Sequence, residues 1–324
     1  GKPKGVLVEH HSMVNFIHWY ATHHSMTPDS ACAAFAAFSF DVSVVQIFAP
    51  LVSGATLHVI PEQLRRSPPD LDAYFVRNQV THAHFPTQFA EQFMRMCVGK
   101  TLQHMIVGGD RLKSFQPGNP YQLTNEYGPS ETTMACLSYD LPEAMDNPPV
   151  GAPVANTQVY ILNSSGRLCP LGVPGEICVA GTGVARGYLN REELTAERFV
   201  ADPFVPGGRM FRTGDRGRWR GDGNVDFIGR MDFQVKIRGY RVEPGEIELR
   251  IKDTGLVQDC VVVALEEPGG NKALAAYCVT SADPGIDLDV DQVKRKLKKV
   301  LPEYMLPSYR SEERRVGKEC ATGC

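Results

Sequence analysis

Three glycine-containing stretches carry side chains that could bind a nucleotide. The first, "NEYGPSETT" at residues 125–133, combines an aromatic ring at Tyr127, a carboxylate at Glu131 and a hydroxyl at Thr132. A ring can stack on a base, a carboxylate oxygen is a hard ligand for Mg²⁺, and a hydroxyl can donate to phosphate. For any one of these residues, an ordinary polar turn with a helix cap at Ser130 is the simpler interpretation.

The second and third stretches suit the phosphate and sugar parts of a nucleotide. In "GKPKG" at residues 1–5, glycines flank two lysines, as in a loop that meets phosphate oxygens. In "FRTGD" at residues 211–215, Asp215 follows a tight glycine turn and could accept from both hydroxyls of a ribose. A solvated basic turn and an ordinary turn aspartate remain the alternatives, and neither stretch matches the GxxxxGK[ST] loop.

Asp41 lies within the apolar run "ACAAFAAFSFDVSVVQIFAP" at residues 31–50. An unpaired buried carboxylate costs several kcal/mol, so a partner is expected. A membrane span is a poor interpretation, because an aspartate at its centre would cost roughly 2.5–3.5 kcal/mol. The run instead predicts a buried strand over 31–38, a turn at 39–41 and a following helix, whose N-cap would be Asp41.

All nine histidines lie within the first 104 residues, and two of them, His82 and His84, flank one alanine. Alternate residues of a strand point the same way without needing a metal, and no cysteine or carboxylate spacing completes a ligand set. A histidine metal site is therefore disfavoured. No GxSxG stretch or Ser-His-Asp order supports a hydrolase.

The elements that must position these residues change in kind along the chain. Strand-like and helix-like runs alternate in the first part, which favours an α/β layer with a mostly parallel sheet in a large subdomain over 1–230. Within it, short alternating strands predict a small barrel or curved sheet over about 150–228. Residues 231–310 predict a small α+β subdomain, and residues 311–324 are interpreted as a disordered or foreign tail.

Composition gives no electrostatic reason to expect nucleic acid or a membrane as a partner. The 324 residues are 43% hydrophobic and 22% charged, with a net charge of −3. The nine cysteines form no CxxC pair and several lie in apolar runs, which indicates small buried hydrophobes in a reducing compartment. With no visible signal peptide, a cytoplasmic location is expected.

Seven stretches, taken in register from residue 1 to about 309, resemble the amino-acid-activating adenylation domains of nonribosomal peptide synthetases, within the adenylate-forming, AMP-binding enzymes. They are "GKPKGV", "FDVS", "NEYGPSETT", "PGEICVAGTGVARGYLN", "FRTGD", "GRMDFQVKIRGYRVEPGEIE" and "LPEYMLP". Each is weak alone, but their shared order is highly specific. The resemblance implies the α/β adenylate-forming architecture, with a barrel-like part in the large subdomain and a hinge at Asp232 before the small one.

The resemblance also implies a two-step ligase reaction. ATP and an amino acid give an aminoacyl-AMP and pyrophosphate, and the acyl group then passes to the phosphopantetheine thiol of a carrier protein. Expected cofactors are ATP and Mg²⁺. Expected partners are an α-amino acid, a peptidyl carrier domain and a condensation domain, in the synthesis of a secondary metabolite.

The nucleotide roles follow by position in the matching motifs. Tyr127 would stack on adenine, Asn125 would bond its amino edge, and Asp215 would hold the ribose. Thr132 at the α-phosphate and Glu131 at the Mg²⁺ would be the catalytic residues. The full set implied to bind ATP is Lys2, Lys4, Gly109, Asn125, Tyr127, Thr132, Asp215 and Arg230.

By the same comparison, Asp41 would pair with the α-ammonium of the substrate. Its apolar neighbours would lower the local dielectric constant and so strengthen this pairing. The other implied pocket residues are Val42, Val45, His84, Ile106, Gly108, Glu126, Met134 and Ala135. Two of these, His84 and Glu126, are unusual around an aliphatic side chain, because buried polar groups need partners. They favour a polar, basic or ring-NH-bearing amino acid.

Departures from the family pattern occur at both ends. The match begins inside the phosphate loop, so the domain is expected to be incomplete at both ends, and the family's C-terminal catalytic lysine is not identifiable; Lys318 is not assigned to it. Two other functions stay open: another adenylate-forming ligase such as an acyl-CoA synthetase, and an inactive binding or structural segment.

Overall fold

The structure is a computed structural model that describes residues 4–115, 118–142, 145–231, 235–237, 240–266, 272–280, 290–307 and 309–312. The chain divides into two compact units, one of residues 4–232 and one from residue 233 onward. The expected hinge residue Asp232 lies outside the described residues, as do Lys2 and Lys318.

The larger unit is built on a seven-stranded sheet in the order β2-β1-β3-β4-β6-β7-β9. The first five strands run parallel: β2 (Thr56–Val59), β1 (Ala31–Ala34), β3 (His82–Pro86), β4 (His104–Gly108) and β6 (Gln122–Tyr127). Two antiparallel strands complete the sheet, β7 (Leu137–Leu141) and β9 (Ala152–Pro153). The sequence prediction of a mostly parallel sheet is confirmed.

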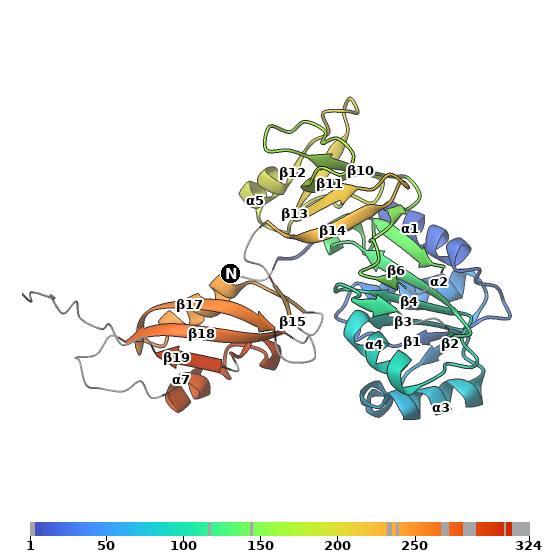
Figure 1. Ribbon diagram of the computed structural model, residues 1–324, viewed down its shortest axis with the longest axis horizontal. Helices are drawn as coiled ribbons and strands as arrows, with labels where there is room; N and C mark the ends of the chain where they lie inside the picture. The colour runs from blue at the N-terminus through green and yellow to red at the C-terminus, as the bar shows by residue number, and fades with distance from the viewer. Residues whose placement is uncertain are drawn as a thin grey trace, which may run out of the picture. The chain divides into compact units, whose positions relative to one another are not determined.

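Helices pack on both faces of this sheet (Figure 1). They are α1 (His10–His23), α2 (Val42–Val52), α3 (Pro68–Asn78) and α4 (Thr87–Met96), with a short 3₁₀ turn η1 (Glu62–Arg66) before α3. Strand alternation divides β4 between two cores: Met105 and Val107 pack with α3 and α4, whereas Ile106 packs with α1 and α2. The sheet therefore separates an aromatic structural core from the face that carries the expected substrate pocket.

An antiparallel sheet follows in the same unit. Its strands are β10 (Thr157–Leu162), β11 (Gly175–Gly181), β12 (Phe199–Ala201), β13 (Arg209–Trp219) and β14 (Val225–Arg230), with α5 (Glu192–Arg198) before β12. The described pairings leave β10 at one edge, so the sheet is open rather than a closed barrel. A shared core joins it to the parallel sheet, because Tyr127 and Leu137 pack against Ile177 and Val225.

Short elements complete the larger unit between the two sheets. The two-residue strands β5 (Ser114–Phe115) and β8 (Met145–Asp146) pair with each other. The 3₁₀ turn η2 (Ser130–Thr132) follows β6 directly and carries two of the expected site residues.

The smaller unit has its own core. Its elements are β15 (Val235–Ile237), β16 (Tyr240–Val242), α6 (Pro244–Lys252), β17 (Val257–Glu266), β18 (Lys272–Thr280), α7 (Val290–Leu297), η3 (Glu303–Met305) and β19 (Tyr309–Glu312). One prediction is corrected here: Ser311 and Glu312, assigned to a tail, pair in parallel with Tyr277 and Cys278. The strand has only four residues, too few to show the alternation of apolar and polar residues by which a strand is recognised in a sequence.

No described helix is long and apolar enough to cross a membrane. Five of the seven described cysteines are buried. They behave as small core residues, as the sequence predicted.

The aromatic core beneath the sheet should dominate the stability of the larger unit. Phe85 is fully buried, with ring centroids of Phe35 and Phe93 at 4.9 and 5.6 Å. Phe85→Ala is expected to lower the unfolding free energy by about 3–5 kcal/mol. Urea unfolding followed by tryptophan fluorescence measures this, because both tryptophans, Trp19 and Trp219, lie in this unit.

The matched control is Phe38→Ala. Phe38 is 84% exposed, so the same substitution there should change the unfolding free energy by no more than about 0.5 kcal/mol. Equal losses in the two variants would contradict the assignment of the core.

Candidate functional site

Strand β6 carries site residues on both faces of the sheet. Successive side chains of a strand point to opposite faces, so Glu126 and Tyr127 point apart. Glu126 contacts His24 at the end of α1, and Tyr127 contacts Asp215 on β13. The two halves of the candidate site are therefore joined through two adjacent residues.

On one face, three of the expected nucleotide residues gather. The Tyr127 hydroxyl donates to Asp215 Oδ2, and Arg230 Nη1 lies 2.7 Å from Asp215 Oδ1. Asp215 and Arg230 are register partners across β13 and β14. Burial and the Asp215 carboxylate raise the pKa of the Tyr127 phenol well above its ordinary value, so the phenol remains a donor.

Two more expected nucleotide residues flank this group. Asn125 is buried, and its Nδ2 donates to the carbonyl of Pro149 at 3.0 Å. Gly109 follows β4 with φ +89°, and a Cβ there would meet no atom within 4 Å. The backbone at Gly109 is therefore open to the close approach of a ligand.

Glu131 is joined to a tyrosine from a distant segment. It is 2% exposed, and its Oε1 accepts from the Tyr188 hydroxyl at 2.6 Å. The ammonium of Lys4 lies 5.9 Å from the centroid of the same Tyr188 ring. Tyr188 thus connects the expected metal ligand with the expected phosphate-binding lysine.

Thr132 lies in η2 with its hydroxyl turned to the backbone. The side chain is 2% exposed, and Oγ1 donates to the carbonyl of Pro129 at 3.0 Å. Two residues earlier, the hydroxyl of Ser130 donates to Asp41 Oδ2 instead. Of the hydroxyls in this turn, Ser130 rather than Thr132 reaches an expected substrate residue.

Asp41 is exposed, which corrects the expectation of a charge buried in an apolar run. Strand β1 ends at Ala34, four residues earlier than predicted, because the side chain of Gln46 accepts the backbone N–H groups of Phe35 and Ala36 at 2.9 and 2.8 Å. The chain therefore leaves the sheet before Asp41. The capping prediction is confirmed: Asp41 is the N-cap of α2 and accepts from the N–H of Val42 at 2.8 Å.

The apolar members of the expected pocket come together between α1, α2 and the sheet. One cluster contains Val42, Val45, Ile106, Met134 and Ala135, together with Phe16, Ile17 and Tyr20 of α1. All of these except Val42 are buried. The pocket residues implied by the resemblance thus share one face of the sheet.

The polar members, His84 on β3 and Glu126 on β6, lie on strands that are separated in the sheet by β4. His84 Nδ1 is 3.2 Å from the hydroxyl of Tyr20, and Glu126 Oε1 is 3.1 Å from His24 Nε2. A Cβ at Gly108 would lie 3.0 Å from the Glu126 carbonyl oxygen and 3.6 Å from His84 Nε2, so only glycine keeps this space free. The second carboxylate oxygen, Glu126 Oε2, is buried and has no hydrogen-bond partner among the described residues.

Burial shifts the pKa values of this polar group toward the uncharged forms. It lowers the pKa of His24 to about 3 and that of His84 to about 4. It raises the pKa of Glu126 to about 7. At neutral pH the contact between His24 and Glu126 is therefore a hydrogen bond to an uncharged imidazole, and Glu126 is close to the midpoint of its titration.

Four residues that complete the site were missed by the sequence analysis. Tyr20 and His24 lie one helical turn apart on α1 and partner His84 and Glu126. Their i, i+4 spacing is a signal for a shared helical face, but nothing local indicates what that face meets. Tyr188 lies inside the family-like stretch "GVARGYLN", and Ser130 had been interpreted only as a cap.

Among the described residues, no three histidine, cysteine or carboxylate side chains are grouped to hold a metal. Glu131 alone offers a buried hard oxygen donor beside the expected phosphate position. Mg²⁺ in phosphate-binding sites takes one or two carboxylates, with phosphates and waters supplying the other ligands. The chemistry of Glu131 therefore fits a magnesium ion that arrives with a nucleotide.

The raised pKa of Glu126 predicts a stability that depends on pH. A carboxyl with a folded pKa near 7 and an unfolded pKa of 4.5 is fully stabilising below pH 4.5, and that stability is lost as pH rises through 7. The loss is on the order of 3 kcal/mol. Glu126→Gln should abolish this pH-dependent loss. Wild type should therefore lose stability relative to the variant when the pH is raised from 5 to 8, and urea unfolding at the two pH values measures the difference.

The control for this prediction is Glu62→Gln, whose carboxylate is exposed. It should unfold with the pH dependence of wild type. If the stability of Glu126→Gln also depends on pH as in wild type, the raised pKa of Glu126 is contradicted as the cause.

Comparison with known proteins agrees with this geometry. The sequence profile of the AMP-binding enzymes matches residues 1–189. The chain is 46% identical over 309 residues to surfactin synthase subunit 1 of Bacillus subtilis (strain 168), which covers 95% of this chain but only 8% of that protein.

Two solved structures are similar over nearly the whole chain. IdnL1 has a TM-score of 0.84 and 27% identity, with 96% of this chain and 66% of that chain covered. NpsA-ThdA from Klebsiella oxytoca, an artificially fused Adenylation-PCP di-domain NRPS, has a TM-score of 0.79 and 26% identity, with 96% and 59% covered. With its profile match over more than half of its length, the chain belongs to the AMP-binding enzyme family, as an adenylation domain of the nonribosomal peptide synthetase type.

Proposed function

We propose that this chain activates an α-amino acid with ATP and then passes it to a carrier-bound thiol. The observation that supports this most is that Asp215 accepts hydrogen bonds from both Tyr127 and Arg230. It brings an aromatic ring and a carboxylate, 88 positions apart in sequence, to one place beside Glu126. A nucleoside and an amino acid side chain would bind on the two faces of β6.

The nucleoside would bind to the aromatic ring, the amide and the carboxylate that gather around Asp215. Tyr127 offers its ring to adenine, and Asn125 offers an amide to the amino edge. Each oxygen of Asp215 accepts one bond in the structure and retains a lone pair for a ribose hydroxyl. The guanidinium of Arg230 pairs with that carboxylate at 2.7 Å.

The phosphates would lie near Lys4 and the η2 turn. When bound, Mg²⁺ would neutralise phosphate charge, and Glu131 would hold it. Tyr188 would orient the Glu131 carboxylate through its hydrogen bond. We retain Thr132 as a candidate for the α-phosphate, although its hydroxyl would have to turn from Pro129 to reach it.

The amino acid would be held at both ends. Asp41 would pair with its ammonium group, and the cluster of Val42, Val45 and Ile106 would contact its side chain. A carboxylate oxygen of the substrate would then attack the α-phosphorus in line, and the bond to the leaving pyrophosphate would break. The protein contributes mainly by positioning the two reactants and by stabilising charge.

The substrate side chain would carry a hydrogen-bond donor. A buried carboxylate oxygen without a partner costs about 1–3 kcal/mol or more, and a donor on the ligand at Glu126 Oε2 would recover it. His84 Nε2 lies beside the space that Gly108 leaves open on the neighbouring strand. A polar, basic or ring-NH-bearing amino acid meets this requirement, whereas valine or leucine does not.

The second step would need further parts of a synthetase. The thiol of a phosphopantetheine arm would attack the acyl carbonyl, and AMP would leave with the electrons of the broken C–O bond. We propose a carrier domain and a condensation domain as partners, and a hinge at Asp232 before the small subdomain. An acyl-CoA synthetase is the second candidate, and Asp41 is the residue that separates the two.

The substrate class can be tested with ATP–pyrophosphate exchange over the common amino acids. We expect side chains with N–H or O–H donors to exceed valine and leucine by at least about tenfold, the value of one good hydrogen bond to a charged group. Glu126→Gln should narrow this preference, and the exposed Glu62→Gln should preserve it. Highest exchange with valine or leucine would contradict the assigned side chain.

The role of Asp41 can be tested on the best substrate of that panel. Asp41→Ala should reduce amino-acid-dependent exchange by about 30-fold or more, since it removes one partner of a charge pair. The affinity for AMP, measured by calorimetry, should stay within about twofold. Asp70→Ala is the matched control, because Asp70 is another exposed aspartate at a helix start. Undiminished amino-acid-dependent exchange in Asp41→Ala would contradict the pairing of Asp41 with the ammonium, whereas exchange that depends on a fatty acid and is unchanged in Asp41→Ala would favour the acyl-CoA synthetase.

A further inference from the structure

The strand that carries Asp215 is interrupted just where Asp215 lies. In the ladder between β11 and β13, Glu176 pairs with Arg216 and Cys178 pairs with Arg212. The single residue Ile177 therefore faces the three residues 213–215. Extra residues of this kind form a β-bulge, which bends a strand and changes the direction of its side chains.

Each backbone group in the bulge has a specific partner. The Thr213 hydroxyl donates to the carbonyl of Ile177 at 2.7 Å and accepts the N–H of Asp215 at 2.9 Å. Gly214 has φ +70°, which glycine adopts without strain. Its buried N–H points out of the ladder, and a side chain from β11 meets it.

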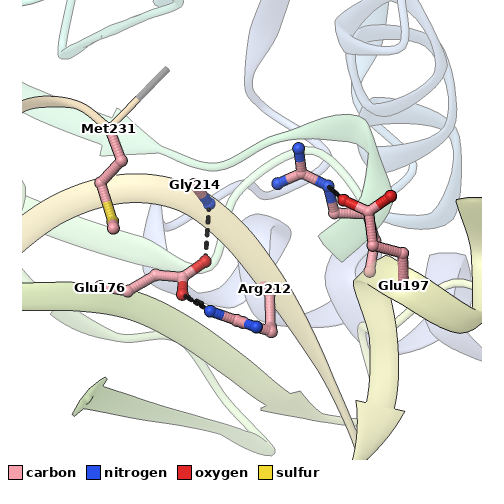
Figure 2. A pocket seen from close by; sticks show the side chains of 6 residues that line it. Glu176, Glu197, Arg212, Gly214 and Met231 are labelled. Atoms are coloured by element: carbon pink, nitrogen blue, oxygen red, sulfur yellow. Dashed lines mark hydrogen bonds and ion pairs between the residues drawn. The ribbon is translucent and has the colours of Figure 1, made fainter. Parts of the chain in front are cut away.

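That side chain is Glu176, which is 7% exposed. Its Oε1 accepts the Gly214 N–H at 3.1 Å, and its Oε2 accepts from Arg212 Nε at 3.0 Å. Figure 2 shows the carboxylate between the backbone of Gly214 and the guanidinium of Arg212. Both oxygens are used, and the charge is compensated by Arg212.

Glu176 also lines a surface pocket with Glu197, Arg198, Arg212, Gly214 and Met231. The charges of this pocket are paired internally, because Glu176 binds Arg212 and Glu197 lies 3.3 Å from Arg198. The carboxylate of Glu176 is thus committed to the bulge and not to a ligand.

We propose that Glu176 is a positioning residue for the nucleotide: by holding the N–H of Gly214, it sets the direction of the Asp215 carboxylate toward a ribose. This inference rests on the proposed role of Asp215. It assigns a function in nucleotide recognition to a residue on β11 that would touch neither the nucleotide nor the amino acid.

The test compares AMP with 2′,3′-dideoxy-AMP by calorimetry on the intact chain. Wild type should prefer AMP by roughly tenfold or more, since two hydroxyls bond a charged carboxylate. Glu176→Ala should reduce this preference to less than about threefold, while its affinity for the dideoxy ligand stays within about twofold of wild type. General damage to the fold would weaken both ligands alike, so it would not give this pattern.

Two further variants keep the outcome decisive. Glu197→Ala lines the same pocket without touching Gly214 and should keep the full preference. Glu176→Gln has one carbonyl oxygen for two donors, so its preference should lie between wild type and Glu176→Ala, with a melting temperature close to wild type. It keeps the test valid if Glu176→Ala does not fold.

Asp215→Ala separates this inference from the proposed function. If Asp215→Ala abolishes the preference and both Glu176 variants retain it fully, the positioning role of Glu176 is wrong and the ribose assignment stands. If Asp215→Ala itself retains the preference, the ribose role of Asp215 fails, and this inference fails with it.

Discussion

The pleat of strand β6 is the constraint on which the candidate site depends. Because consecutive side chains of a strand point to opposite faces, Glu126 and Tyr127 belong to different environments although they are neighbours in sequence. Glu126 faces α1 and the pocket, and Tyr127 faces β13 and Asp215. A register slip of one residue would turn Glu126 and Tyr127 to each other's face of the sheet. The parallel pairing of Gly108 on β4 with Glu126 on β6 fixes the register.

The two faces differ in their electrostatics. On the Tyr127 face the charges are paired, since Asp215 is bound by Arg230 at 2.7 Å. On the Glu126 face burial suppresses charge, with the pKa of His24 lowered and that of Glu126 raised. Perturbed pKa values of this kind are common at functional sites, where a ligand restores the missing interaction. The sheet thus separates a face with a paired carboxylate and guanidinium from a face where burial disfavours charge.

Local patterns in the sequence predicted some of this structure residue by residue. The strands β10 and β11 lie in the part of the chain, about 150–228, where short alternating strands were predicted, because alternation and turn residues mark them. The gathering of Tyr127 and Asp215 followed from the resemblance and not from any local signal.

Contacts between side chains and distant backbone could not be predicted in this way. The side chain of Gln46 binds the two backbone N–H groups that follow strand β1, and the strand does not continue to Asp41. Glu176 holds Gly214 from another strand. Neither contact changes the hydrophobic period of its segment, so neither leaves a trace in the pattern.

The hydrogen bond between Ser130 and Asp41 has a thermodynamic consequence. It joins the start of α2, where an amino acid would be held, to the turn that carries Glu131, where phosphates would lie. An ammonium that takes over Asp41 competes with the Ser130 hydroxyl for the same carboxylate and releases it to another acceptor. If the two sites have the proposed roles, the affinities for the two substrates would be linked, and by reciprocity each would change the other by the same factor.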